Sequence, residues 1–405
     1  MGLILNDLKN ACELEHVCDY VNNRTTSSMN YISTENMLPN KGGISESTII
    51  PPGTTTEYKI GDILISNIRP YFQKIWCADR CGGCSADVLC IRAKENTDSK
   101  YLYYLLSQQA FFDYVMSGAK GCKMPRGDKK QIMQWPVNIP AIDVQKKVVA
   151  ILSSLDNKIR LNRRINDNLE AMAKQLYDYW FVQFDFPNEE GKPYKSSGGA
   201  MVWNEKLKRE IPEGWNVANV FDELSVQYGF PFSTELFTEG PTSIPVVRIR
   251  DILENSVSAY SEEEVDEKYK LQKQDLLVGM DGNFHMNYWN DNVSYLNQRS
   301  VRLRAKSKST VSIMQAKYDI APYIKAKELR AKGSTVGHLS DKDLKELFVL
   351  VCPNIDFRNK FDSILAEIIE NRCEMIELTK QRDELLPLLM NGQASVNYHL
   401  SKLLL

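Results

Sequence analysis

Apolar residues in this chain follow two different periods, and each period predicts a different kind of element. They alternate with their neighbours at Ile63 and Ile65 and again at Val88 and Cys90, which is the two-residue period of a β-strand. Further apolar residues gather between Tyr101 and Met116, where they indicate a helix. Strands and a helix mixed in one stretch predict an α+β module.

Two long stretches lack both glycine and proline and are predicted to be long helices, over residues 143–180 and 356–386. Apolar residues recur in both at alternating steps of three and four, the heptad pattern of a coiled-coil seam. We expect the two helices to pack on each other as an antiparallel coiled coil, although two unrelated core helices are an alternative. The predicted seam residues are Val148, Ile151, Leu155, Ile165, Leu169, Met172 and Leu176 in the first helix, and Phe361, Ile364, Ile368, Leu378 and Leu385 in the second.

Polar residues interrupt both apolar stripes. Lys158 and Asn162 interrupt the first, and Asn371 and Arg382 interrupt the second. Polar seam positions lower the stability of a coiled coil but fix its register. At 1.5 Å per residue the first helix is ~57 Å long, so it can serve as a spacer of fixed length between two globular modules.

The chain repeats itself at an offset of about 213 residues. Asp62-Ile-Leu-Ile falls on Asp275-Leu-Leu-Val, and Pro140-Ala-Ile-Asp falls on Pro353-Asn-Ile-Asp. Ala119-Lys-Gly falls on Ala331-Lys-Gly with the offset changed by one residue. Shared composition alone would scatter such matches over many offsets, so the pattern indicates an internal duplication.

The duplication divides the chain into two similar halves, each a module followed by a long helix. Phe184, Pro187 and Trp215 belong to a turn-rich, non-periodic stretch between the halves, which we interpret as an exposed linker with aromatic anchors. The expected order is a first module over 1–141, a helix over 142–183, the linker over 184–215, a second module over 216–353, a second helix over 354–392 and a tail over 393–405.

The composition is that of an ordinary soluble protein, with 43% hydrophobic and 25% charged residues among 405. No apolar run approaches the roughly 18 residues that a membrane helix needs. The acidic start of the chain does not resemble a signal peptide, so we expect a cytoplasmic protein. Nine cysteines in a long chain favour reduced thiols over a disulfide framework.

The net charge of −2 does not indicate a nucleic-acid partner, but basic residues are concentrated locally. Five lie between Lys120 and Lys130, opposed only by Asp128. Five more, with no acidic residue among them, lie between Arg299 and Lys308. Either run is a candidate for contact with phosphate, although charge runs are commonly just solvated faces.

The motifs of several enzyme classes are missing from the sequence. It has no Asp/Asn-Pro-Pro-Tyr motif of an amino-methyltransferase, no Walker loop and no dinucleotide-binding glycine fingerprint. None of its four histidines lies in a metal or nucleophile motif. A nuclease whose catalytic carboxylates are scattered along the chain remains an alternative. The missing motifs favour a chain without catalytic residues.

Four cysteines, Cys77, Cys81, Cys84 and Cys90, fall within fourteen residues. Four thiolates can form a tetrahedral zinc site, and the spacing of Cys81 and Cys84 is typical of zinc ligands. A zinc ribbon usually pairs two such knuckles across a longer loop, however, and the second module has no cysteines at the equivalent place. We therefore expect no metal, and metal analysis of the purified protein tests this.

Several motifs resemble those of one family, in the order in which that family carries them. Pro140-Ala-Ile-Asp-Val-Gln-Lys-Lys-Val-Val, leading into Leu155-Asp-Asn-Lys-Ile, resembles the central conserved region of the specificity subunits of type I restriction-modification systems. Phe184-Asp-Phe-Pro and Ile211-Pro-Glu-Gly-Trp resemble that family's lead-in to its second target-recognition domain. Each motif alone is weak, but their order and the internal repeat cover nearly the whole chain.

The resemblance implies an α+β fold with two pseudo-symmetric target-recognition domains, separated by two long helices packed as an antiparallel coiled coil. Such a subunit reads a bipartite, asymmetric site in double-stranded DNA and is itself non-catalytic. It docks two methyltransferase subunits, which methylate adenine, and two restriction subunits, which are motor-nucleases. The family's S-adenosylmethionine, ATP and Mg are used by those partners. A stand-alone coiled-coil DNA-binding scaffold or regulator is the alternative.

Loops that differ between the two modules are where we expect DNA to be read. Bases are read mainly by Arg, Lys, Asn, Gln, Ser and Thr side chains from loops or helix ends. Residues 118–126 and 332–338 form polar, glycine-bearing loops at equivalent places. The candidate DNA-binding residues are Arg24, Arg69, Tyr71, Lys120, Lys123 and Arg126 in the first module, and Arg248, Arg250, Asn283, His285, Asn287, Ser334, Thr335 and His338 in the second.

Overall fold

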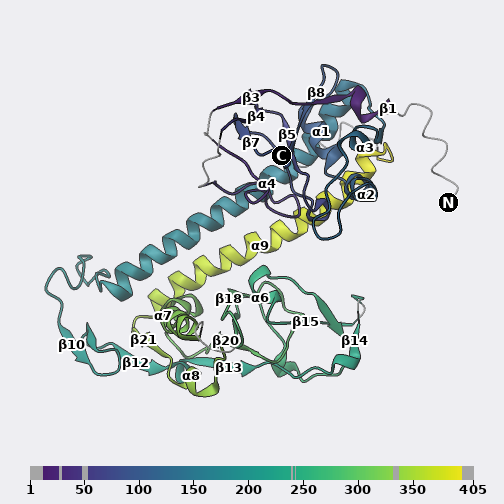
Figure 1. The fold of residues 1–405 in the computed structure, drawn as a ribbon. Helices are drawn as coiled ribbons and strands as arrows, with labels where there is room; N and C mark the ends of the chain where they lie inside the picture. The colour runs from purple at the N-terminus through teal and green to yellow at the C-terminus, as the bar shows by residue number, and fades with distance from the viewer. Residues whose placement is uncertain are drawn as a thin grey trace. The chain divides into compact units, whose positions relative to one another are not determined.

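The computed structural model describes residues 12–26, 30–47, 53–238, 240–241, 243–331 and 337–394. The chain forms two compact units (Figure 1). Unit 1 comprises Met1–Lys158 and Leu378–Leu405, and unit 2 comprises Ile159–Glu377. Each unit therefore contains one module together with parts of both long helices.

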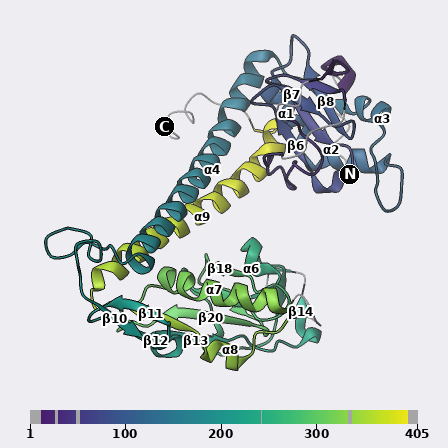
Figure 2. The ribbon, with the colours of Figure 1, turned by 60° about the vertical axis from the view of Figure 1, so that its left-hand side comes forward.

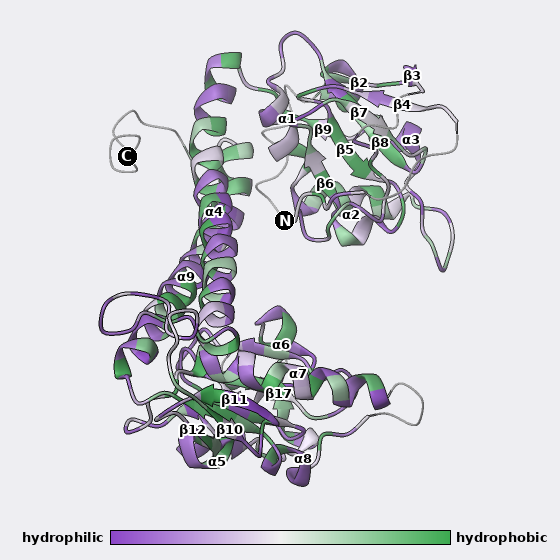
Figure 3. Cartoon of the chain, turned by 90° about the vertical axis from the view of Figure 1, so that its left-hand side faces the viewer, coloured by the Kyte–Doolittle hydropathy of each residue, from purple (hydrophilic) through white to green (hydrophobic). Residues whose placement is uncertain are grey.

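A four-stranded antiparallel sheet forms the centre of unit 1, in the order β2-β8-β5-β6. Its strands are β2 (Cys18–Tyr20), β8 (Val88–Ala93), β5 (Ile63–Ser66) and β6 (Ile75–Cys77). The strands predicted at Ile63–Ile65 and Val88–Cys90 are confirmed. All of β5 is buried, because Ile63 and Ile65 pack on the helix side while Leu64 packs against Trp76 on the other. Figure 3 shows β5 as a hydrophobic strand.

Helices cover one face of this sheet, and smaller sheets complete the unit. The helix predicted between Tyr101 and Met116 is two helices, because Gln108 adopts an extended backbone between them. The helices are α1 (Ser99–Leu106), α2 (Gln109–Ser117) and α3 (Lys129–Met133), with 3-10 turns η2 (Leu14–His16) and η3 (Pro70–Phe72). The smaller sheets pair β1 (Cys12–Glu13) with β9 (Pro136–Val137) and order β3 (Arg24–Thr25), β4 (Thr55–Tyr58) and β7 (Gly82–Cys84).

Unit 2 repeats this plan. Its central sheet has the order β13-β20-β17-β18, and helix α7 lies along one face of it (Figure 2). The strands of this sheet are β13 (Leu224–Tyr228), β20 (Ser300–Ala305), β17 (Leu276–Gly279) and β18 (Met286–Tyr288). The other strands of the module are β12 (Asn216–Asn219), β14 (Phe237–Thr238), β15 (Ile244–Val247), β16 (Ala259–Ser261), β19 (Tyr295–Leu296) and β21 (Phe348–Val351). The short helices are α5 (Val220–Glu223), α6 (Asp251–Glu254) and α8 (Asp341–Lys345), with η5 (Thr234–Leu236) and η6 (Glu267–Tyr269), and α7 spans Ile313–Ala331.

One ion pair occurs at the same place in both modules. In unit 1, Arg92 donates to both oxygens of Asp62, at 2.7 Å each. In unit 2, Arg304 donates to both oxygens of Asp275, at 2.6 and 2.7 Å. Each aspartate also accepts the backbone N–H three residues before it, at 2.7 Å. The repeated aspartate thus closes the turn that leads into the central strand and ties it to the neighbouring strand.

The linker region is an ordered part of unit 2. Strands β10 (Met201–Asn204) and β11 (Arg209–Pro212) form an antiparallel hairpin within it. Phe186 stacks on Trp215 with ring centroids 5.0 Å apart, and both rings contact Phe357. The aromatic residues are therefore buried as the sequence predicted and anchor a segment that is otherwise largely exposed.

Both predicted long helices are present, and their lengths are equal. Helix α4 spans Ile142–Tyr177 and α9 spans Ile355–Met390, 36 residues each. A π-helical turn, η4 (Asp178–Val182), follows α4. The helices pack antiparallel in each unit, with Val148 and Leu152 near Leu386 and Leu389 in unit 1.

The predicted seam residues differ in burial. Val148, Leu155, Phe361, Ile364, Ile368 and Leu378 are buried, whereas Ile151, Ile165, Leu169, Leu176 and Leu385 are half-buried. Met172 is 44% exposed, and Ala173 beside it is fully buried. The buried stripe of α4 instead runs through Asn162 and Asn166, which are 5% and 6% exposed. Polar side chains occupy part of the seam because they have partners on the facing helix.

Those polar partners differ between the units. In unit 2, Asn371 donates to the Asn166 side chain at 2.9 Å. In unit 1, Arg382 donates to Asp156 at 3.0 Å, and Tyr104 donates to the other oxygen of the same carboxylate at 2.7 Å. The repeat offset places Leu169 and Ile369 at the unit 2 positions that correspond to Arg382 and Asp156.

Candidate nucleic-acid interface

Two loops of unit 1 that are distant in the sequence lie side by side. The backbone N–H of Arg69 donates to the Pro125 carbonyl at 2.8 Å, and Ile68 forms a β-bridge with Arg126. Residues Lys120 and Arg126 exchange two backbone hydrogen bonds, at 2.9 and 3.0 Å, which close the second loop. We call the segments 67–72 and 119–127 the loop pair of unit 1.

Five of the predicted DNA-binding residues belong to this loop pair. Each has an exposed side chain: Arg69, Tyr71, Lys120, Lys123 and Arg126. Lys120 pairs with Asp128 at 3.0 Å, and Arg126 pairs with Asp87 at 3.2 Å. The remaining candidate of this module, Arg24, is exposed on the short strand β3. The loop pair therefore presents four cations and an aromatic ring on one surface.

The corresponding segments of unit 2 meet in the same way. The N–H of Gly282 donates to the Gly337 carbonyl at 2.9 Å, and Asp281 forms a β-bridge with His338. Arg69 and Gly282 occupy equivalent places, and both have positive φ, 50° and 71°. We call segments 280–285 and 337–339 the loop pair of unit 2. The frame of hydrogen bonds repeats while the side chains on it change.

The side chains on the second loop pair are only partly those expected to contact DNA. Asn283 is exposed at the turn, and His285 is half-buried beside it. The ring of His338 contacts Asp281, with Nδ1 2.6 Å from a carboxylate oxygen. Arg299 contacts the other oxygen of Asp281 at 3.3 Å. Ser334 and Thr335 lie outside the described residues.

Three other candidates of the second module lie outside the two segments of the loop pair. The guanidinium of Arg248 donates to the Ser258 carbonyl at 2.7 Å. Asn287 donates to the carbonyls of Ile252 and Leu253, at 3.2 and 3.0 Å, and so ties α6 to β18. Arg250 is exposed, 3.9 Å from Asp251. The structure thus gives Arg248 and Asn287 internal partners, which the sequence could not reveal because those partners lie in other elements.

The basic run that begins at Arg299 splits into two groups in the structure. Arg302 is buried and donates to Ser225, and Arg304 holds Asp275. Lys306 donates to the carbonyls of Phe221 and Asp222. Arg299 differs, because it is exposed beside the loop pair. Arg299 was named only within the basic run and not among the individual DNA-binding residues, and its place in the repeat, equivalent to Asp87, could have singled it out.

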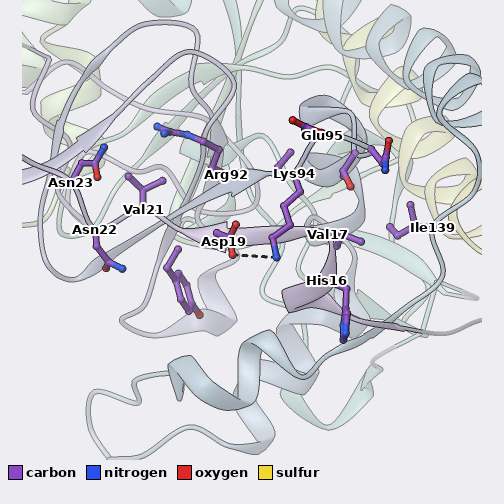
Figure 4. Close-up of a pocket in the computed structure, with 14 residues that line it drawn as sticks. His16, Val17, Asp19, Val21, Asn22, Asn23, Arg92, Lys94, Glu95 and Ile139 are labelled. Carbon is purple, nitrogen blue, oxygen red and sulfur yellow. Dashed lines mark ion pairs between the residues drawn. The ribbon is translucent and has the colours of Figure 1, made fainter.

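A hollow of about 740 Å³ lies beside β2 and β8 in unit 1 (Figure 4). Lys94 and Asp19 form an ion pair of 3.3 Å within it, and His16 and Glu95 line it. Its lining contains none of the candidate DNA-binding residues that the structure describes. We therefore place the candidate interface at the loop pairs and not in this hollow.

The four clustered cysteines lie on different sides of the sheet. Cys84 and Cys90 are buried together in the cluster around Trp76, whereas Cys77 packs with the helix-side core and Cys81 is exposed. Burial raises the pKa of Cys77 to about 11, which disfavours the thiolate form that binds metals. Within the described residues, no group of three His, Cys, Asp or Glu side chains is placed to hold a metal ion.

Comparisons with known proteins all point to one family. A family model described as "Type I restriction modification DNA specificity domain" matches residues 10–171 and 212–387. The chain is 26% identical to the specificity subunit of the type I restriction enzyme MjaIX from Methanocaldococcus jannaschii over 319 residues, 75% of this chain and 71% of the relative. It is 30% identical to the HindI specificity subunit from Haemophilus influenzae over 164 residues, 38% of this chain and 36% of the relative.

A solved structure has the same fold. The crystal structure of a type I restriction-modification system S subunit from M. genitalium matches with a TM-score of 0.53. The match covers 96% of both chains at 14% sequence identity. No helix in the described parts of the chain combines the length and apolar character needed to cross a membrane.

Proposed function

The chain belongs to the type I restriction-modification DNA specificity family, and we propose that its two modules each read one half of a bipartite DNA site. One observation carries this proposal: the two loop pairs share their backbone hydrogen bonds, and most of their side chains differ. Sequence is read by side chains at base edges, while a common frame sets their position. Unlike side chains on a like frame predict two different half-sites.

The charge of the first loop pair supports contact with DNA there. Arg69, Lys120, Lys123 and Arg126 are exposed, and only Lys120 and Arg126 have carboxylate partners among the ion pairs described. Cations without a carboxylate partner are the groups that gain most from phosphate oxygens. We expect Lys123 and Arg69 to contribute affinity and the rest of the loop pair to contribute selectivity.

The chemistry of restriction and modification is assigned to partner subunits. We propose that the chain docks two methyltransferase subunits that methylate adenine, and through them two restriction subunits. S-adenosylmethionine, ATP and Mg would then be bound by those partners and not by this chain. The long helices are our candidate docking elements, because both of them contribute residues to each of the two units.

Methylation mapping tests the function. The chain is expressed with its methyltransferase partner, and methylated adenines are mapped in the host genome. We expect one motif with two unlike half-sites separated by a fixed gap. The combined variant Lys123→Ala and Arg126→Ala should weaken one half-site only and leave the second module folded. Scattered methylation without a shared motif, or DNA binding that needs no methyltransferase, would contradict the proposal.

A further inference from the structure

Three positions meet at each loop pair at equivalent places in the frame: 68, 87 and 126 in unit 1, and 281, 299 and 338 in unit 2. In unit 1 the N–H of Asn67 donates to the Asp87 carbonyl at 2.9 Å. In unit 2 the N–H of Met280 donates to the Arg299 carbonyl, also at 2.9 Å. The three positions can therefore be compared one by one.

Each set of three contains an arginine paired with an aspartate, but the two residues stand at different positions. In unit 1 the guanidinium comes from Arg126 and the carboxylate from Asp87, 3.2 Å apart. In unit 2 the guanidinium comes from Arg299, at the place equivalent to Asp87, and its partner is Asp281, 3.3 Å away. Both units therefore have an arginine next to a carboxylate, but the two residues occupy different members of the three equivalent positions.

Stability does not explain these pairs. The two arginine side chains are 56% and 69% exposed, and exposed ion pairs contribute only about 0–1 kcal/mol. The pairs of Arg92 with Asp62 and Arg304 with Asp275, in which the aspartate is buried, behave differently, because each stands at the same positions in both modules. The two structural ion pairs occupy equivalent positions in both modules. At the loop pairs an arginine and an aspartate are again paired, but they stand at different positions in the two modules.

The chemistry of a paired guanidinium favours a base over a phosphate. A neighbouring carboxylate repels phosphate oxygens, but a single contact of this kind leaves the other N–H groups of the guanidinium free to donate. A planar fork of two donors matches the O6 and N7 acceptors of guanine in the major groove. In unit 2 the His338 ring holds the second oxygen of Asp281, which restricts the carboxylate further.

We infer that Arg126 and Arg299 are the guanine-reading residues of their modules, and that Asp87 and Asp281 orient them. This inference rests on the proposed function and adds a named base to each half-site. It assigns Asp87 and Asp281 as positioning residues without DNA contacts of their own. Arg69 and Lys123, whose side chains have no such carboxylate among the described ion pairs, remain the phosphate-contacting candidates of unit 1.

The test uses the full chain with its methyltransferase partner and a library of randomised DNA duplexes, from which bound sequences are selected and counted. Arg126→Gln should reduce discrimination about 10- to 100-fold at one guanine of one half-site and leave the other half-site unchanged. Arg299→Gln should do the same in the other half-site. Arg126→Lys should keep most of the affinity and still lose the guanine preference, because an ammonium lacks the planar fork.

Two matched controls are available in the chain. Arg80 pairs with Asp79 at 2.8 Å, and Lys208 pairs with Glu205 at 2.7 Å, both on exposed surfaces. Arg80→Gln and Lys208→Gln remove equivalent exposed pairs and should leave both half-sites intact. Asp87→Asn should weaken the same guanine preference as Arg126→Gln, by a smaller factor.

The possible results separate the inference from the function on which it rests. If Arg126→Gln weakens binding equally to all sequences and reduces the salt dependence, Arg126 contacts phosphate and the inference is wrong. If the wild-type motif has no guanine at a position that responds to Arg126 or Arg299, the inference is also wrong. If the wild-type complex selects no motif at all, the proposed function fails first.

Discussion

Arg69 adopts a backbone conformation that an arginine rarely takes. Its φ is 50°, in the left-handed region, and the equivalent residue of the second module is a glycine, Gly282, with a φ of 71°. A side chain with a Cβ loses about 1–2 kcal/mol in this region, and glycine does not. The side chain of Arg69 is exposed, so this position tests whether the cation contributes to DNA binding independently of the backbone strain.

Arg69→Gly should therefore separate stability from recognition. We expect the free energy of unfolding of the first module to stay equal or rise by up to about 1 kcal/mol. The relief of backbone strain stabilises the folded state, and the greater entropy of glycine in the unfolded chain offsets part of that gain. DNA affinity should fall, because the cation is lost. Denaturant unfolding and a binding titration measure the two effects. Arg69→Ala is the control that keeps the strain, and unchanged affinity in both variants would exclude Arg69 from the interface.

Asp319 gives unit 2 a dependence on pH. The Tyr177 hydroxyl donates to this carboxylate at 2.7 Å, and the Leu350 N–H donates at 3.1 Å. Burial nevertheless raises the pKa of Asp319 to about 6. The folded state then binds this proton more tightly than the unfolded chain, so the stabilising contribution is complete below about pH 4 and is lost as pH rises through about 6.

Tyr177→Phe should make this loss larger. Removing the hydroxyl takes away a donor that favours the ionised carboxylate, so the pKa of Asp319 rises further. The free energy of unfolding should fall more steeply between pH 5 and 8 in the variant than in the wild type, as measured by urea unfolding across that range. Tyr318→Phe serves as a nearby control, because no hydrogen bond from Tyr318 to Asp319 is described. Parallel pH profiles would count against this account.

The sequence predicted those parts of the candidate site that lie within one continuous loop. It predicted less well the residues whose contacts come from distant parts of the chain. The glycine-bearing loop at 118–126 presents exposed basic side chains, as its sequence indicated, and its contact with DNA stays a prediction. Arg248 and Asn287 were selected for their chemical type, but their partners, Ser258 and the α6 carbonyls, become neighbours only in the folded module. Arg299 was considered only as part of a basic run that could contact phosphate, because the sequence gave no sign that Arg302 and Arg304 of the same run have partners inside the module.

At the scale of elements, the helix pair contains a buried amide contact. Asn371 donates to the Asn166 side chain, and Asn166 donates to the Ile368 carbonyl at 3.1 Å. Asn166 is 6% exposed. A satisfied polar pair in a seam contributes little net stability but disfavours other registers, because any shift leaves buried amides without partners.

Asn371→Leu should destabilise the helix pair by about 1–3 kcal/mol, because it leaves the Asn166 oxygen buried without a donor. The double variant Asn166→Leu and Asn371→Leu should recover that loss or exceed the wild-type stability, since apolar side chains of similar volume then face each other. Denaturant unfolding of the wild type, both single variants and the double variant measures the coupling. Additive losses in the double variant would show that the two amides do not interact.

The heptad pattern predicted these helices well, and their exact seam less well. Both are 36 residues long, and the absence of glycine and proline was enough to find them. The seam was drawn through Met172, which is exposed, because the pattern follows apolar residues and overlooks Asn166. The linker shows the same limit, since the burial of Phe186 depends on its contact with Phe357, which lies far along the chain and leaves no periodic pattern.

At the scale of the whole molecule, the duplication predicts how the DNA site is spaced. Helix α4 passes unbroken through Lys158 and Ile159, where the two units divide. Each added residue lengthens a helix by about 1.5 Å, so a heptad adds ~10 Å, or about three base pairs of DNA.

Inserting one heptad after Lys158 and one after Glu377 should keep both half-sites and lengthen the gap between them by about three base pairs. Seven residues preserve the seam, because they complete whole turns of the heptad pattern. Methylation mapping with the partner methyltransferase reads the gap directly. A four-residue insertion is the control that should disrupt the seam and reduce methylation, and an unchanged gap in the heptad variant would rule out a helical spacer.

The contact of Arg382 with Asp156 bears on how the chain assembles as it is made. Helix α4 is synthesised before α9, and because the two halves are alike, a pairing of α4 with the α4 of another chain is the alternative that the sequence has to disfavour. In that pairing the repeat offset would bring Asp156 opposite Leu169 instead of Arg382. An ionised carboxylate facing leucine is unfavourable, so the contact between Arg382 and Asp156 favours packing of α4 on α9 over packing of α4 on a second copy of α4.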